Sequence, residues 1–522
     1  MNPPTSPSRR WTRILRPLLI LLACVVTLIA LFYAEEDLRG RLAWGKARRQ
    51  AAAAGERLDY SAFIPQTVPD DDNFAMGPLL RLAFDFTHTP TGIRWRDTNA
   101  WDRARDIVYD KTPRGWGKKA PDTGDVDRGT LADLPAAADF YRGNTNYPQS
   151  ASSNPAEVVL TALNKFEPDL KELREAAAAR PYSRFPIEYN YDPPMAILLP
   201  HLVLIKGLVS VCELRAAAEL DLHKTDDAFV DLQLAFRLSD SIQDEPFLVD
   251  QLVRLAGLSL TVQGIHEGIV RQAWSDAQLD AFQKYLENVD LLFGYQRAMR
   301  SELAFNLRGI EYYRDLGSRG IPLDGAANSG NTILNWMPSG WYDQNMVTIA
   351  EYYRGYILNA INQTNRIVKP KVIAEMDSDI ANRRAGPYNV LGRMLMPAFS
   401  QASLHFARGQ TLVDEARVAC ALDRYRLAHS EIPDSLTALV PRFLTQVPND
   451  LFDGQPLRYK KTGPDAYFLY SIGWNQKDDG GEIVLGTGSA PRANAKAGDW
   501  VWQIPPPQAK TAAEYSAFHS AA

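Results

Sequence analysis

The sequence predicts a mainly helical protein: an N-terminal transmembrane helix, an irregular helical bundle or solenoid domain, and a small C-terminal α+β domain with an antiparallel sheet. Three observations predict this fold class. Residues 17–34 are apolar and uncharged, apolar side chains recur at helical spacing through much of 156–362, and the period changes to two after residue 456. With 522 residues, the chain is long enough for two or three domains with large cores.

The membrane prediction depends on the stretch PLLILLACVVTLIALFYA at residues 17–34. As a helix it would span about 27 Å, close to the hydrocarbon thickness of a bilayer. Arginines precede the stretch and acids follow it: Arg9, Arg10, Arg13 and Arg16, then Glu35, Glu36 and Asp37. The positive-inside rule therefore predicts that residues 1–16 are cytoplasmic and that the chain after residue 35 lies outside the cytoplasm.

Two alternatives stay open for this segment. It could be a cleaved signal peptide, or a lipoprotein signal that ends at Cys24. Ten mostly apolar residues follow Cys24, which a lipoprotein does not need, and bulky Phe32 stands two residues before the late cleavage candidate Ala34. These features favour an uncleaved anchor.

Residues 35–398 are predicted to form an extracytoplasmic helical domain. The stretches 200–222 and 225–242 read as an antiparallel helical hairpin, and Ser275 with Gln278 reads as a capping box that starts another helix. No clean repeat at a period of about 34 residues is present, so an irregular arrangement is expected.

Two stretches rich in glycine, proline and small polar residues are predicted to be long loops of this domain. They lie near residues 111–155 and 316–341.

Composition and motifs narrow the function. The chain has 57 basic and 62 acidic residues, so it lacks the basic excess that nucleic-acid binding requires. No two of the seven histidines lie within five residues of each other, and no C-x-x-C, Walker, G-x-S-x-G or Rossmann motif is present. We predict no catalytic residues. The absence of these motifs favours an interaction protein over an enzyme.

Cys212 and Cys420 would face an oxidising space and could pair. Each lies within an amphipathic helical pattern, however, which favours two separate buried thiols.

The C-terminal unit, residues 399–504, begins with a helix that proline ends at Pro433. A short helix over 435–440 follows, and then two alternating strands, 457–460 and 467–471, joined by a Gly-Pro turn. Residues 505–522 begin with three prolines, continue with alanine and serine, and are predicted to be disordered.

Three short motifs of this unit recur in order: YRLAHSEIPDSLTALVP, DLFDGQPLRY and LYSIGWNQKDDGG. Together they resemble the globular half of the pseudopilins of bacterial type II secretion. The resemblance implies a bacterial inner-membrane protein of the periplasmic cell envelope, with protein partners in a secretion- or pilus-related assembly. The chain departs from the family at Arg16-Pro17, where pseudopilins have a leader-peptidase glycine, and in the long helical domain between the two parts.

The loop Asn475 to Gly481 follows the last of these motifs. Carboxylate, amide and backbone oxygens are the ligands that calcium prefers, and in pseudopilins the corresponding loop binds calcium. The resemblance carries a possible calcium site onto Asn475, Asp478, Asp479 and Asp499. The alternative, left open here, is a solvated turn that ends in two glycines.

The sequence therefore predicts a membrane-anchored extracytoplasmic interaction or structural protein with a possible calcium ion. The competing prediction is a hydrolase that acts on an envelope polymer, with its site in the helical domain.

Overall fold

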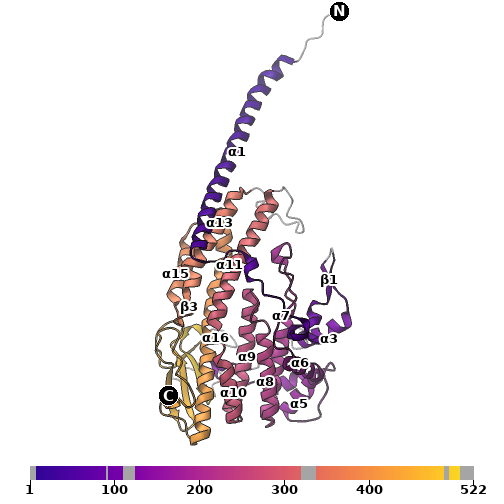
Figure 1. Ribbon diagram of the computed structural model, residues 1–522, viewed down its shortest axis with the longest axis vertical. Coiled ribbons are helices and arrows are strands. Elements are labelled where there is room, and N and C mark those ends of the chain that lie inside the picture. The colour runs from indigo at the N-terminus through magenta and orange to yellow at the C-terminus, as the bar shows by residue number, and fades with distance from the viewer. Residues whose placement is uncertain (1–7, 90–91, 110–123, 319–336, 487–492, 506–522) are drawn as a thin grey trace, which may run out of the picture.

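The computed structural model describes residues 8–89, 92–109, 124–318, 337–486 and 493–505 (Figure 1). Residues 1–7 of the predicted cytoplasmic segment, 506–522 of the predicted disordered tail, 111–123 of the first predicted loop and 319–336 of the second lie outside the described residues. The described remainder of the first loop, 124–155, carries one 3-10 turn and the helix Leu134–Tyr141. The described part is mainly helical, with a long apolar N-terminal helix and small antiparallel sheets near the C-terminus, as the sequence predicted.

Helix α1 (Ser8–Ala53) is a single helix of 46 residues. Its first half projects away from the body on its own, and its second half runs along α13 (Ser339–Tyr352) (Figure 1). None of the residues in its most apolar window is buried. By length and composition, this half can cross a membrane, as an anchor or as a signal sequence does.

A second helix, α7 (His201–Asp221), is also apolar enough to cross a membrane, but half of its apolar window is buried inside the protein. It pairs with α8 (Thr225–Asp240) as the predicted hairpin. The apolar character of α7 therefore belongs to a core helix.

The body is a bundle around α9 (Leu248–Val270) and α16 (Val390–His429). The predicted capping box is present where α10 begins: Ser275 Oγ accepts from the backbone N–H of Gln278, whose side chain accepts from the Ser275 backbone. The other helices of the bundle are α10 (Asp276–Glu287), α11 (Leu291–Ser318) and α15 (Pro370–Asn382).

A second core lies on the other side of α7. Helices α7 and α8 contribute to it together with small elements of the preceding chain: η1 (Tyr60–Phe63), η3 (Phe74–Met76), α2 (Pro78–Arg81), η4 (Leu82–Phe84), α3 (Thr98–Tyr109), α4 (Leu134–Tyr141), α5 (Pro155–Leu163), η6 (Asn164–Phe166) and α6 (Glu167–Ala179). The 3-10 turns η2 (Asp70–Asp72) and η7 (Pro194–Ala196) and the hairpin of β1 (Phe86–Thr89) and β2 (Gly92–Trp95) lie outside this core. The 3-10 turn η5 (Val126–Arg128) packs instead against α9 and the C-terminal sheet.

The helix expected over 342–362 is interrupted. After α13 come a π-helical turn (Tyr353–Ile357), the short α14 (Leu358–Ala360), and then β3 (Ile361–Asn362), which pairs with β4 (Ile367–Val368). Helix α16 then runs without a break for 40 residues, so the predicted domain boundary at residue 399 lies inside it.

The C-terminal unit carries the predicted hairpin, β5 (Arg458–Gly463) and β6 (Ala466–Ser471), preceded by a 3-10 turn at Leu436–Leu439. Strand β9 (Trp500–Ile504) pairs antiparallel with β6 on its other side, and β7 (Ile483–Leu485) with β8 (Ala493–Gly498) forms a separate pair. The sheet lies beside α16 (Figure 1), and side chains of one face, Tyr467, Leu469 and Trp502 among them, join the same core as those of α9, α10 and α16. Phe468 and Val501 instead pack with Ile483 of β7 in a separate small cluster. One face of the sheet and the bundle therefore share an apolar core.

Candidate functional site

The loop predicted to bind calcium starts where β6 ends, and its base is organised by Asp450. The Asp450 side chain is 1% exposed and accepts from Ser471 Oγ at 3.0 Å and from the backbone N–H of Ile472 at 2.9 Å and Phe452 at 3.0 Å. Burial raises the pKa of this carboxyl. One carboxylate thus ties the end of β6 to the segment that precedes β5.

Arg458, on β5, contacts three carboxylates of this region. Its guanidinium lies 3.0 Å from Asp450, 2.5 Å from Asp453 and 3.2 Å from Asp478. The sequence reasoning missed both Asp450 and Arg458 as site residues. The signal that could have found them is the motif DLFDGQPLRY, which spaces two acids and one arginine around a turn.

Asp499 directly precedes β9 and holds the loop through hydrogen bonds to its backbone. It is 3% exposed, and its two oxygens accept the backbone N–H of Asp479 at 3.3 Å and of Gly481 at 2.6 Å. Burial raises the pKa of Asp499 to about 6, although these two N–H groups favour its charged form. The positive φ of Gly481 lets the backbone turn toward this carboxylate.

Asn475 and Asp479 meet at the outer end of the loop. Asn475 Nδ2 donates to Asp479 Oδ2 at 2.8 Å, and the Lys477 ammonium pairs with the other oxygen of Asp479. The hydrogen bonds from Lys477 and Asn475 lower the pKa of Asp479.

Asp478, whose side chain is half exposed, accepts from Tyr470 Oη at 3.3 Å and from the backbone N–H of Gly480 at 3.0 Å. Together with Arg458, these donors occupy both oxygens of Asp478. The structure therefore brings the four predicted ligands into one loop, but it aims donors of the chain at their carboxylates. A calcium ion would have to displace Lys477 and Arg458.

In the described part of the chain, no group of three or more histidine, cysteine, aspartate or glutamate side chains is arranged to hold a metal ion. Calcium binding at the loop thus stays a prediction for experiment.

A second polar site lies where α1 meets the body. Glu36 is 4% exposed, and its two oxygens accept from Trp341 Nε1 at 3.0 Å and from Tyr388 Oη at 2.9 Å. Asp37 accepts the backbone N–H of Gly340 at 2.9 Å, in the first turn of α13. A carboxylate at a helix N-terminus is stabilised by the helix dipole. We call these contacts of Glu36 and Asp37 the junction.

Helices α1 and α13 approach each other closely at the junction. A Cβ on Gly40 would lie 2.3 Å from Gly340 Cα, and a Cβ on Gly340 would lie 1.9 Å from the Glu36 carbonyl oxygen. Only glycine fits at both positions without a backbone shift. Phe32, in the last part of the apolar half, packs edge-on against Trp341 at 6.2 Å between ring centres.

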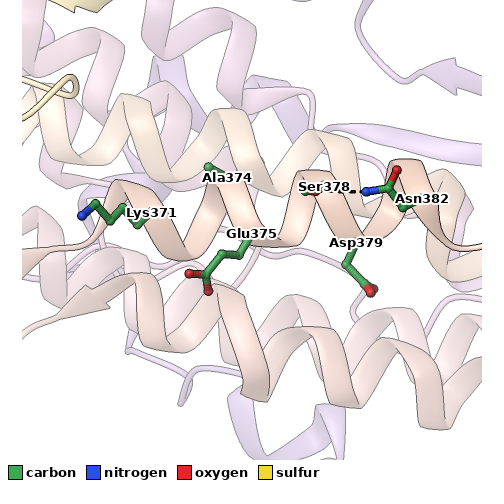
Figure 2. A pocket seen from close by; sticks show the side chains of 6 residues that line it. All are labelled: Lys371, Ala374, Glu375, Ser378, Asp379 and Asn382. Carbon is green, nitrogen blue, oxygen red and sulfur yellow. Dashed lines mark hydrogen bonds between the residues drawn. The ribbon is translucent and has the colours of Figure 1, made fainter.

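A cavity of about 580 Å³ opens along α15 and is lined by Lys371, Ala374, Glu375, Ser378, Asp379 and Asn382 (Figure 2). Figure 2 shows Glu375 and Asp379 pointing to the same side of this one helix. Asp379 accepts a hydrogen bond from Tyr352 Oη. Hydrolysis of a glycosidic bond uses two carboxylates on opposite sides of that bond, so two acids on one helix face do not reproduce the arrangement.

The buried histidines are part of the cores. His201 stacks on Phe185 at 4.2 Å between ring centres, and His266 packs edge-on against Trp502 at 5.1 Å. Burial lowers the pKa of His201 to about 3 and that of His266 to about 4, which keeps both rings neutral at physiological pH.

Cys212 and Cys420 lie buried as separate thiols, as the helical patterns favoured.

Comparison with known proteins adds no relative: no family model, no curated protein and no solved structure matches the chain.

Proposed function

We propose that this chain is a single-pass membrane-anchored interaction protein whose body lies outside the cytoplasm. In this proposal it is a structural component of a secretion- or pilus-related assembly in a bacterial envelope. The observation that carries the membrane part is the junction, because the apolar half of α1 continues without a break into a half that is hydrogen-bonded to the body.

The junction also supports an uncleaved anchor over a signal peptide. Signal peptidase cuts just after the apolar segment, at small residues. Here the candidate Ala34 lies inside a continuous helix, between Phe32, which contacts Trp341, and Glu36, which is buried. Cutting at this point would separate the apolar half from a packed helix rather than from an extended linker.

The resemblance to pseudopilins supports the assembly part of the proposal. The C-terminal unit has a long helix followed by an antiparallel hairpin, the two elements predicted from its sequence, and a third strand, β9, beside them. For the competing hydrolase, the cavity along α15 takes both of its acids from one face of a single helix, which does not suit two carboxylates on opposite sides of a bond.

The test uses the full chain with a short tag at each end, expressed in a bacterium. We expect one band that carries both tags, resistance of this band to alkaline extraction of the membranes, and reaction of a Gln50→Cys thiol with an impermeant maleimide in intact spheroplasts.

Loss of the N-terminal tag from the mature protein would show a signal peptide instead. Reaction of Gln50→Cys only after lysis would overturn the orientation.

A further inference from the structure

Helix α1 has one face that the body leaves uncovered, opposite the face that docks on α13. The docked face buries Glu36, Gly40 and Trp44, which follow helical spacing. Leu38 and Leu42 lie half a turn away from Glu36 and Gly40, and they are 61% and 65% exposed. Two leucines beyond the predicted span are thus turned away from the protein.

This face continues into the apolar half with a seven-residue period. One row is Leu21, Leu28, Glu35 and Leu42, and the other is Cys24, Leu31, Leu38 and Gly45. Two such rows, offset by three residues, are the pattern by which two helices pack in a coiled coil. We call the face formed by these eight residues the seam. Among the described residues, and apart from the backbone of α1 itself, only Arg49 of the same helix has an atom within 4 Å of a Cβ built on Gly45, which leaves room for a close neighbour there.

Lipid does not account for the whole seam. Leu42 is eight residues beyond Ala34, so it lies about 12 Å past the end of the apolar segment. The interfacial layer on each side of the hydrocarbon core is about 5–8 Å thick. Leu42 therefore stands in water unless another protein surface covers it.

Three arginines beside the seam, Arg39, Arg41 and Arg48, have acidic neighbours within the chain. Glu35 is the one charged residue in the two rows, and it pairs with Arg39 at 2.5 Å. Burial raises the pKa of Asp343 and of Glu311, and the nearby Arg41 and Arg48 oppose this rise. These acidic neighbours reduce the positive charge that two like seams bring together, and Lys46 and Arg49 are the remaining exposed basic residues beside the seam.

We propose that a second copy of this chain covers the seam, so that two α1 helices pair in parallel through the membrane and for about two turns beyond it. The membrane supports this occupant, because every copy enters with the same direction and at the same depth, and so a seven-residue pattern meets itself in register. This inference rests on the proposed function, since it requires α1 to remain attached and to span the bilayer.

The native cysteines give a direct test in the full-length protein. Cys24 lies in the seam and is exposed, whereas Cys212 and Cys420 are buried. Oxidation of membranes with copper phenanthroline should convert most of the chain to a disulfide-linked dimer at twice its mass. Cys24→Ser should abolish this product.

A matched pair of variants in the Cys24→Ser background tests the geometry. Leu38→Cys should restore the dimer, because it returns a thiol to the seam. Val25→Cys places a thiol at nearly the same depth but about 100° around the helix, and should give at least tenfold less dimer. Equal cross-linking of Val25→Cys, an adduct of any other mass, or a monomer in the unmutated protein would each overturn the proposal.

The same gel distinguishes failure of the helix pairing from failure of the proposed membrane anchor. A mature chain that keeps its N-terminal tag but stays monomeric overturns the pairing alone. A mature chain without that tag has no free Cys24 thiol, because cleavage near Ala34 removes the residue and lipoprotein processing leaves lipid on its sulfur. This outcome overturns the anchor and the pairing together.

Discussion

The junction and the C-terminal loop both bury carboxylates, but they neutralise them differently. At the junction, Glu36 takes hydrogen bonds from the neutral donors Trp341 and Tyr388 at 2.9–3.0 Å, and the Arg39 guanidinium lies farther away, at 3.5 Å. In the loop, Asp479 pairs with Lys477 and has a lowered pKa, whereas Asp499 has only backbone donors and a pKa raised to about 6. Burial thus dominates at Asp499 and raises its pKa, whereas at the less buried Asp479 the hydrogen bonds from Lys477 and Asn475 outweigh burial.

The comparison also shows which contacts hold distant segments together. The hydrogen bonds of the junction join residues more than 300 positions apart, while those of Asp450 join residues within 22 positions. Breaking the loop should therefore unfold a local unit, and breaking the junction should release a helix. Four predictions test this difference.

The largest effect is expected for Asp450→Ala. It leaves the Ser471 hydroxyl and two backbone N–H groups without their acceptor, and it removes a buried partner of Arg458. Breaking a buried, hydrogen-bonded ion pair costs about 3–5 kcal/mol. The free energy of unfolding in urea, measured on the full chain in detergent, should fall by about that amount.

The matched control for this change is Asp453→Ala, which removes a more exposed partner of the same arginine. It should cost less than about 1 kcal/mol. Equal losses for the two variants would mean that Asp450 does not organise the loop.

Asp499 should make stability depend on pH. Its pKa is raised in the folded protein to about 6 from a value of 3.8, so the folded state binds the proton more tightly. The corresponding stability is fully present below pH 3.8 and is lost as the pH rises through about 6. The shift corresponds to on the order of 2–3 kcal/mol.

Asp499→Asn should therefore flatten the curve of unfolding free energy against pH between pH 4 and 7. Asp479→Asn is the control with the opposite sign: its lowered pKa gives stability above pH 3.8 that is lost in acid. If the unfolding free energy of Asp499→Asn and of the unmutated protein changed with pH in the same way, the raised pKa of Asp499 would not be the cause of the pH dependence.

Gly340→Ala should loosen the junction. The added Cβ would meet the backbone of Glu36, which cannot move aside as a flexible side chain could. Overpacking of this kind costs about 1–3 kcal/mol. Protease sites between residues 35 and 53 should become accessible in the variant, as measured by limited proteolysis and mass spectrometry.

Gly355→Ala serves as the comparison, since nothing lies within 4 Å of its Cβ position. Protection of residues 35–53 that is the same in Gly340→Ala and Gly355→Ala would mean that the close approach is unimportant.

The smallest effect is expected from calcium. Lys477 and Arg458 already occupy the carboxylates of Asp479 and Asp478, so millimolar calcium should stabilise the unmutated protein by about 1 kcal/mol or less. Lys477→Ala frees Asp479 and should strengthen the response. The measurement is the rate of hydrogen exchange at the amides of Asp479 and Gly481, compared between calcium and chelator for the unmutated protein and for Lys477→Ala.

Identical exchange in calcium and in chelator for both proteins would leave the loop as a turn held by the chain's own cations. Loss of the response in Lys477→Ala would mean that the lysine assists calcium rather than competing with it.

Local patterns of the sequence determined much of this protein. The apolar run in α1, the capping box at Ser275, the hairpin of β5 and β6, and the grouping of Asn475, Asp478 and Asp479 each depend on residues close together in the chain. Hydrophobic periodicity, caps and turns act over such distances, so they can be recognised without the fold.

Only the tertiary structure decided the rest. It placed Glu36 beside Trp341 and Tyr388, made Gly40 and Gly340 a close crossing, and turned Arg458 toward three acids. It also continued α16 through residue 399, because the apolar faces at both ends of this helix share one core. Contacts between distant segments depend on which faces pack together, and neither spacing nor composition records that choice.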